Sequence, residues 1–413
     1  MPRRNSTGLK KLRRLLLLYC LPVVSSASAL AGGSAPTIVE YRIPTFPNGA
    51  IDITAGPDGN LWFTEADVDQ IGRSTVLGEM VEFDVPSVGG SPDHITTGPD
   101  GNLWFTEAFG NRIGRITPAG MVTEFVIPTP SSVPAGIAAG ADGNLWFTES
   151  FANRIARISL NGVVTEIPLP TRAAFPTAIV AGPDGNLWFT EADADQIGRI
   201  SQSGVINEFV VPTKSSFPAA ITVGSDHNLW FTEADVDQIG RVTTDGQFTE
   251  FALPTILASP AGIASAADGN LWFTERDADQ IGCITPGGVI DEWPLPTEGS
   301  FPTAITRGPD EALWFVEPLV GQIGRAVPGA AGASPTASLT PVANSSATPS
   351  PTPTMTPPPG GSVTAVPDPS PTGTPPPCVG DCDGDRQVTV DEIVIGVAIA
   401  LGTQGDEIGR AHV

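Results

Sequence analysis

The sequence is poor in basic residues, histidine and cysteine. Its 413 residues include 21 Lys and Arg against 45 Asp and Glu, only three His, and four Cys without the spacing of a zinc site. Phosphate contacts need clustered Lys and Arg, so this acidic balance argues against nucleic acid and anionic membrane as partners. No segment reaches the length of a membrane-spanning helix. Scarce Lys and Met beside 46 Gly and 42 Pro argue against a helical protein.

The N-terminal residues have the pattern of a secretory signal. Basic residues within the first fourteen positions precede the apolar run Leu15–Val24, and the small-residue segment ends with Ala29-Leu30-Ala31. Ten apolar residues are too few to cross a bilayer as a helix. We therefore expect residues 1–31 to be a signal peptide and the protein to be secreted, either extracellular or periplasmic.

One sequence word recurs along most of the chain. Gly-Pro-Asp-Gly-Asn-Leu-Trp-Phe-Thr-Glu begins at Gly56 and returns in variants. The tryptophans of the successive words are 42 residues apart: Trp62, Trp104, Trp146, Trp188, Trp230, Trp272 and Trp314. A period of this length, made of short strands, is typical of a β-propeller with four strands per blade. The sequence thus predicts an all-β, seven-bladed β-propeller over residues 36–329.

The third unit shows the expected strands, which are 135–139, 145–149, 154–159 and 163–167. Consecutive Leu-Trp-Phe breaks the alternation of a half-exposed sheet and indicates blades that are buried on both faces, with the tryptophans in the core. The last unit lacks a fourth strand, whereas residues 37–45 match the fourth strand of other units. We expect this N-terminal strand to complete the seventh blade and close a monomeric ring without open edges.

Beyond the repeats the composition changes. Residues 330–377 are rich in Pro, Ser and Thr, with 14 prolines between 331 and 377, and are expected to form a disordered linker. Residues 378–407 have the oxygen spacing of an EF-hand loop followed by a helix, and they resemble one calcium-binding half of a dockerin. The predicted Ca²⁺ ligands are Asp381, Asp383, Asp385, Gln387 through its carbonyl, Thr389 and Glu392.

Several features of this tail bear on that prediction. Arg386 occupies the sixth loop position, where Gly normally makes the sharp turn, and a solvated acidic loop is the alternative interpretation. The dockerin resemblance suggests a cohesin-like partner. Cys378 and Cys382 are placed to form a disulfide in an oxidising compartment, whereas Cys283 is expected to be a buried thiol. Residues 408–413 look like a translated sequencing adapter.

A glutamate ends the second strand of every unit. These residues are Glu65, Glu107, Glu149, Glu191, Glu233, Glu275 and Glu317. Four units add paired acids in the next loop, Asp277 and Asp279 being one such pair, whereas units two and three carry Phe109 with Arg112 and Phe151 with Arg154. We consider two interpretations: a face that binds a cation or cationic ligand, or repeat duplication with each Glu satisfied by local hydrogen bonds.

The repeated words LWFTE, IGRIT and TEF followed by a Pro-Thr pair resemble the virginiamycin B lyase, or streptogramin lyase, family. The resemblance covers all seven repeats and nothing C-terminal to them. It implies elimination at the ester of a cyclic depsipeptide, with a His that removes a proton and Mg²⁺ held by glutamates. The family's Glu-Pro-His becomes Phe301-Pro302-Thr303 here, and its second His becomes Ala261. Glu317 alone matches, and Glu275 is a further candidate metal ligand.

None of the three histidines stands at the family's base position. Asp93 occupies that position in the second unit, and strand alternation would turn His94 to the other face, as a packed or partly exposed structural residue. His227 replaces a turn glycine and is expected to be solvated. His412 falls within the adapter-like residues.

Three functions remain open from the sequence. The first, which we favour, is a secreted, non-catalytic propeller whose face binds a small molecule, peptide, glycan or protein, with Asp93, His94, Phe109, Arg112, Phe151, Arg154, Asp277 and Asp279 as candidate contacts. The second is an active Mg²⁺-dependent, lyase-like enzyme with a non-histidine base, for which Asp93 is the candidate. The third is a scaffold-attached component that binds through its tail.

Overall fold

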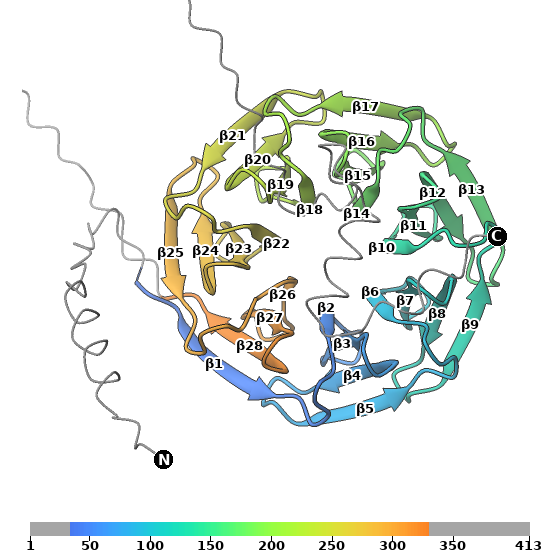
Figure 1. The fold of residues 1–413 in the computed structure, drawn as a ribbon, viewed down its shortest axis with the longest axis horizontal. Helices are drawn as coiled ribbons and strands as arrows, with labels where there is room; N and C mark the ends of the chain where they lie inside the picture. The colour runs from blue at the N-terminus through green and yellow to red at the C-terminus, as the bar shows by residue number, and fades with distance from the viewer. Residues whose placement is uncertain (1–33, 330–413) are drawn as a thin grey trace, which may run out of the picture. The chain divides into compact units, whose positions relative to one another are not determined.

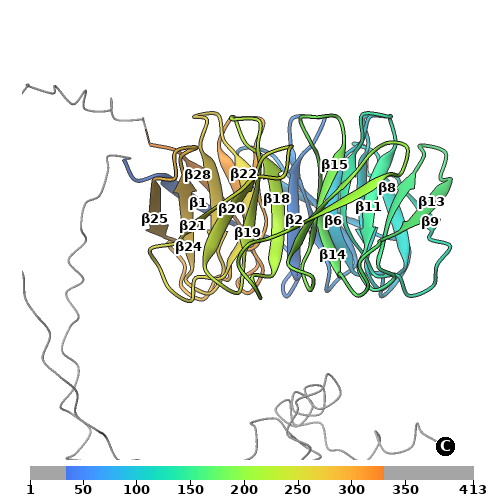
Figure 2. The ribbon, with the colours of Figure 1, turned by 90° about the horizontal axis from the view of Figure 1, so that it is seen from above.

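The computed structural model describes residues 34–329, which form a closed ring of seven four-stranded antiparallel sheets (Figure 1). Seen from the side, the ring is a disc with its strands inclined across the thickness (Figure 2). This confirms the predicted seven-bladed β-propeller. The predicted signal peptide, linker, calcium loop, disulfide and adapter-like end lie outside the described residues. No helix that is long and apolar enough to cross a membrane occurs in residues 34–329.

Each blade runs from an innermost strand at the axis to an outermost strand at the rim (Figure 1). The innermost strands are β2 (Ala50–Ala55), β6 (Pro92–Thr97), β10 (Pro134–Ala139), β14 (Pro176–Ala181), β18 (Pro218–Val223), β22 (Pro260–Ser265) and β26 (Ile305–Arg307). The second strands are β3 (Leu61–Glu65), β7 (Leu103–Glu107), β11 (Leu145–Glu149), β15 (Leu187–Glu191), β19 (Leu229–Glu233), β23 (Leu271–Glu275) and β27 (Leu313–Glu317).

The outer half of each blade has the same regularity. The third strands are β4 (Gln70–Ser74), β8 (Arg112–Ile116), β12 (Arg154–Ile158), β16 (Gln196–Ile200), β20 (Gln238–Val242), β24 (Gln280–Ile284) and β28 (Gln322–Val327). The outermost strands are β5 (Met80–Asp84), β9 (Val122–Val126), β13 (Val164–Pro168), β17 (Ile206–Val210), β21 (Phe248–Ala252), β25 (Ile290–Pro294) and β1 (Thr37–Arg42).

The second strands are buried on both faces, as the Leu-Trp-Phe word predicts. Leu61, Trp62 and Phe63 have no exposed surface, and the same holds for most of their counterparts. Within the first blade, the Trp62 indole N–H donates to Asp58 at 3.0 Å and its ring stacks on Phe83 with centroids 5.6 Å apart. Burial of a large aromatic side chain between sheets is the main source of stabilisation here. The tryptophans are therefore core residues.

The innermost strands do not alternate regularly. In six of the seven blades the pairing of the innermost strand with the second strand shifts after its first residue, for example between Pro92 and Ile95 in β6. Such a shift is a β-bulge, which turns the strand and redirects the side chains within it. Which residues face the axis therefore cannot be read from alternation alone.

Adjacent blades are joined by a glutamate on an outermost strand. Glu82 of β5 accepts from the backbone N–H and the hydroxyl of Thr45, at 2.8 and 2.9 Å. The ring closes through the same contact: Glu40 of β1 accepts from the N–H and the hydroxyl of Thr297, at 3.1 and 2.6 Å. The strand β1 pairs along its whole length with β28, which confirms the predicted closure.

Removal of the closing carboxylate is predicted to weaken the ring. Glu40→Ala leaves the two Thr297 donors without their charged acceptor, and the free energy of unfolding should fall by about 2 kcal/mol. Glu79→Ala is the matched control, because Glu79 is exposed; its effect should stay within about 0.5 kcal/mol. Denaturant unfolding of both variants checks this, and equal stability of the two would show that the contact does not hold the closure.

Candidate functional site

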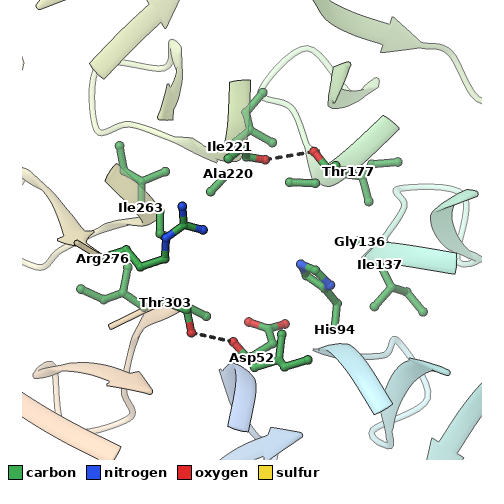
Figure 3. A pocket seen from close by; sticks show the side chains of 18 residues that line it. Asp52, His94, Gly136, Ile137, Thr177, Ala220, Ile221, Ile263, Arg276 and Thr303 are labelled. Carbon is green, nitrogen blue, oxygen red and sulfur yellow. Dashed lines mark hydrogen bonds between the residues drawn. The ribbon is translucent and has the colours of Figure 1, made fainter. Parts of the chain in front are cut away.

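The ring has a channel along its axis, and charged side chains contribute to the wall of this channel. Its volume is about 390 Å³, and its wall comes from the innermost strands of the blades (Figure 3). Most of the lining is apolar: isoleucines such as Ile137, Ile179 and Ile221 alternate with Ala and Gly. The charged lining residues are Asp52, His94 and Arg276. The channel therefore combines an apolar wall with three charged groups.

Small residues at the axis allow the innermost strands to approach one another. A Cβ on Gly136 would lie 2.5 Å from the Thr177 carbonyl oxygen, and one on Gly262 would lie 2.5 Å from the Thr303 carbonyl oxygen. These contacts are with backbone, which cannot move aside. Glycine at the two positions is thus required by the close packing of neighbouring blades.

His94 lies on β6 and points into the channel (Figure 3). Its Nδ1 lies 3.3 Å from Asp93 Oδ2, and its side chain is 34% exposed. Burial lowers the pKa of His94, but the carboxylates of Asp93 and Asp52 outweigh burial and raise this pKa to about 9. His94 is therefore an imidazolium at neutral pH.

Asp52 is the counterpart of His94 on β2. Its two carboxylate oxygens accept from the backbone N–H groups of Ile53, at 2.9 Å, and of Ile95 in the next blade, at 2.8 Å. Burial raises the pKa of Asp52 and the charge of His94 opposes that rise. The carboxylate thus bridges two innermost strands beside the imidazole.

Arg276 follows β23 and reaches into the channel from the side opposite His94 (Figure 3). Its Nη2 donates to Ser259 Oγ at 2.8 Å, and its Nε lies 3.6 Å from Asp277 Oδ1. The guanidinium also lies over the Phe301 ring, 5.0 Å from its centroid. These contacts fix the head group at the channel wall.

The structure corrects the expectation for His94. Alternation placed it on the face away from position 93, yet His94 lines the channel whereas Asp93 does not. The pairing of β6 with β7 is irregular between Pro92 and Ile95, so simple alternation does not apply to this part of the strand.

The seven glutamates that end the second strands do not form an exposed acidic ring. All seven have no exposed surface, and neither carboxylate oxygen of any of them has a hydrogen-bond partner among the described residues. Burial, followed by the charge of the glutamate on the outermost strand of the same blade (Glu40 of β1 for Glu317), raises their pKa to about 8, and to about 9 for Glu275. Burial therefore favours the neutral carboxylic acid, and the described residues supply none of the local hydrogen bonds that the second interpretation expects.

The loop acids that follow have two different positions. Asp279 accepts from the backbone N–H groups of Gly299 and Phe301, at 2.7 and 2.9 Å, and so fixes the loop that leads into the next blade. Asp69, Asp195 and Asp237 do the same in their units. Asp277, by contrast, is exposed and pairs with Arg276.

The candidate contacts of units two and three lie away from the channel wall. Phe109 and Phe151 are 79% and 70% exposed. Arg112 lies 3.8 Å from the buried Glu107, and Arg154 forms an ion pair with Glu166 at 2.8 Å. The structure thus does not bring these four residues together with His94 and Arg276 around the channel.

The positions that match the family's magnesium site hold only one of its expected ligands. Glu317 is buried without a hydrogen-bond partner, but Phe301, Thr303 and Ala261 stand at the other expected positions. Within residues 34–329, no group of three or more His, Cys, Asp or Glu side chains is placed to hold a metal ion. The described residues therefore do not provide a complete site for Mg²⁺ held by glutamates.

The sequence analysis did not identify Asp52 and Arg276 as candidate site residues. Both depart from their repeat column: Asp52 stands where other units have His94, Gly or Ala, and Arg276 stands where others have Ala66, Ala108, Ser150, Ala192, Ala234 or Pro318. A comparison of the residues at each position of the repeat would have shown these two charged exceptions.

Two smaller predictions were confirmed, because Cys283 is a buried free thiol and His227 is exposed.

The fold and its channel define a seven-bladed propeller with a charged axial cavity. The sequence profile of the virginiamycin B lyase family matches residues 33–218 and 173–333, and this chain belongs to that family. The crystal structure of virginiamycin B lyase from Staphylococcus aureus is 38% identical, with a TM-score of 0.68 over 71% of this chain and 99% of that one.

Two further structures agree with this assignment. A streptogramin B lyase is 35% identical, with a TM-score of 0.70 over 73% of this chain and 100% of that chain. A catalytically inactive variant of the Staphylococcus aureus enzyme with quinupristin is 38% identical, with a TM-score of 0.68 over 71% and 99% of the two chains.

Because these glutamates are buried, we predict that the free energy of unfolding falls as pH rises. In the unfolded chain their pKa is near 4.5, whereas in the fold it is about 8, or about 9 for Glu275. Their contribution to stability is thus complete below about pH 4.5 and is lost as pH rises through 8 to 9. At pH 8, Glu191→Gln should raise the free energy of unfolding by ~2 kcal/mol, and at pH 5 by much less.

The control for this prediction is Glu298→Gln, which changes an exposed glutamate. It should leave the pH dependence as it is in the natural protein. Denaturant unfolding of the full chain at pH 5 and pH 8 measures both variants, and a pH-independent effect of Glu191→Gln would contradict the raised pKa.

Proposed function

We propose that this propeller is a binding module that takes a small molecule into its axial channel. The observation that carries the proposal is the channel itself, with about 390 Å³ of space and charged groups converging on an apolar wall. Such a cavity, apolar with a few placed polar groups, is the usual form of a small-ligand site.

Two further observations support binding over the family's elimination chemistry. The positions that match the family's catalytic His residues are Thr303 and Ala261, neither of which can act as a general base. His94 does place an imidazole in the channel, but its raised pKa, about 9, keeps it protonated at neutral pH and unable to accept a proton.

An active lyase is the second candidate, and the specific observation in its favour is the pairing of His94 with Asp93. Above pH 9 the imidazole would be neutral and able to accept a proton. The binding and lyase functions are separated by the experiment below.

Filling the channel is predicted to abolish binding. Ala220 lines the wall, and Ala220→Phe places a ring in the cavity. A small-molecule library that includes a streptogramin B antibiotic is screened by the rise in thermal unfolding temperature on binding. Ligands that stabilise the natural protein should leave Ala220→Phe unchanged, whereas Ala119→Phe, at an exposed turn, should keep the full response.

The same samples are analysed for ring-opened streptogramin after incubation with Mg²⁺ at pH 7 and pH 9.5. The binding module should leave the antibiotic intact at both pH values. Ring opening that disappears in His94→Gln or Glu317→Gln would make the protein a lyase and overturn the proposal.

We also propose, from the sequence alone, that residues 378–407 bind Ca²⁺ and attach the protein to another secreted protein. The support is the six-ligand spacing from Asp381 to Glu392. In calorimetric titration of the full chain with Ca²⁺, one site should be present and Glu392→Gln should weaken it by about tenfold or more, because it removes the ligand expected to be bidentate. Unchanged heat in that variant would exclude the loop as the site.

A further inference from the structure

We infer that the channel recognises a small organic anion with an apolar body, whose charged group is held between His94 and Arg276. The inference rests on the proposed function, since it names the class of molecule that enters the same channel. It follows from which hydrogen-bonding groups face the cavity and which of them already have partners.

The two cationic side chains point into the channel from opposite sides (Figure 3). Within residues 34–329, Arg276 donates from Nη2 to Ser259 and lies beside Asp277, but neither its Nη1 nor its Nε makes a hydrogen bond. His94 directs Nδ1 towards Asp93, and its Nε2 makes no hydrogen bond to the described residues. Each cation therefore keeps at least one N–H donor for a molecule in the channel.

The acidic neighbours do not compete for these donors. Asp93 and Asp277 contact Nδ1 of His94 and Nε of Arg276, and neither carboxylate lines the channel. Asp52 does line it, but both of its oxygens accept from backbone N–H groups. The groups left to recognise a ligand are thus donors on cations, which select a carboxylate or another anion.

The charge of these two residues contrasts with the rest of the protein. The chain has a formal net charge of −24, and His94 and Arg276 are the cations of the channel lining. His94 carries its charge at neutral pH, since its pKa is about 9. The isoleucines of the wall add a preference for ligands whose apolar body gains from burial against them.

Three probes of one shape test the charge preference. The full chain is titrated calorimetrically at pH 7 with 3-phenylpropanoate, 3-phenylpropanamide and 3-phenylpropylamine. The carboxylate should bind about tenfold or more tightly than the amide, and the amine more weakly than either, because charge-assisted hydrogen bonds form with the carboxylate alone.

Variants assign the preference to the two cations. His94→Gln and Arg276→Gln should each weaken carboxylate binding by about tenfold or more and leave amide binding nearly unchanged. Arg276→Lys, which keeps the charge, should retain part of the preference. Arg172→Gln is the control, because it removes an equal charge from an exposed loop between blades. Thermal unfolding of each variant shows that the ring is intact.

The outcomes separate this inference from the proposed function. If the three probes bind equally and Ala220→Phe blocks all of them, the channel remains a binding site but anion recognition is overturned. Tighter binding of the amine would also overturn anion recognition. Failure of all three probes overturns anion recognition too, while the library screen decides on the channel independently. Carboxylate binding that survives Ala220→Phe would show that the channel is not the site.

Discussion

Every sheet of this protein must be covered on both faces. The word Leu-Trp-Phe places apolar side chains on both sides of the second strand, and in the first blade all three residues have no exposed surface. A stack of such sheets with free ends would expose an apolar face at each end. A closed ring removes both ends at once, and the pairing of β1 with β28 is the contact that makes closure possible.

Closure also determines where function can reside. Seven innermost strands meet at the axis, so a single side chain from one repeat faces residues from repeats far away in the chain. Most of these positions hold Ala, Gly or Ile, which fit the narrow space. Three residues depart from that pattern: Asp52, His94 and Arg276. The ring places them around one channel, although Asp52 and Arg276 are 224 positions apart in the sequence.

The periodic features could be predicted from the sequence, and the exceptions to them could not. The 42-residue spacing of tryptophans from Trp62 onwards gave the number of blades, and residues 37–45 gave the closing strand. Alternation did not predict that His94 rather than Asp93 lines the channel, and the pairing of β6 with β7 is irregular at these residues. The full burial of Glu65 was missed because a strand-end carboxylate is expected to reach solvent.

The pairing of Thr37 with Val327 places the two ends of the described ring side by side in one blade. The remaining six blades follow one another with the same connections. A chain joined at those ends and opened between any other two blades would therefore have the same contacts in a different order. In this architecture the starting point of the polypeptide is a matter of connectivity alone, and circular permutants are compatible with one and the same folded ring.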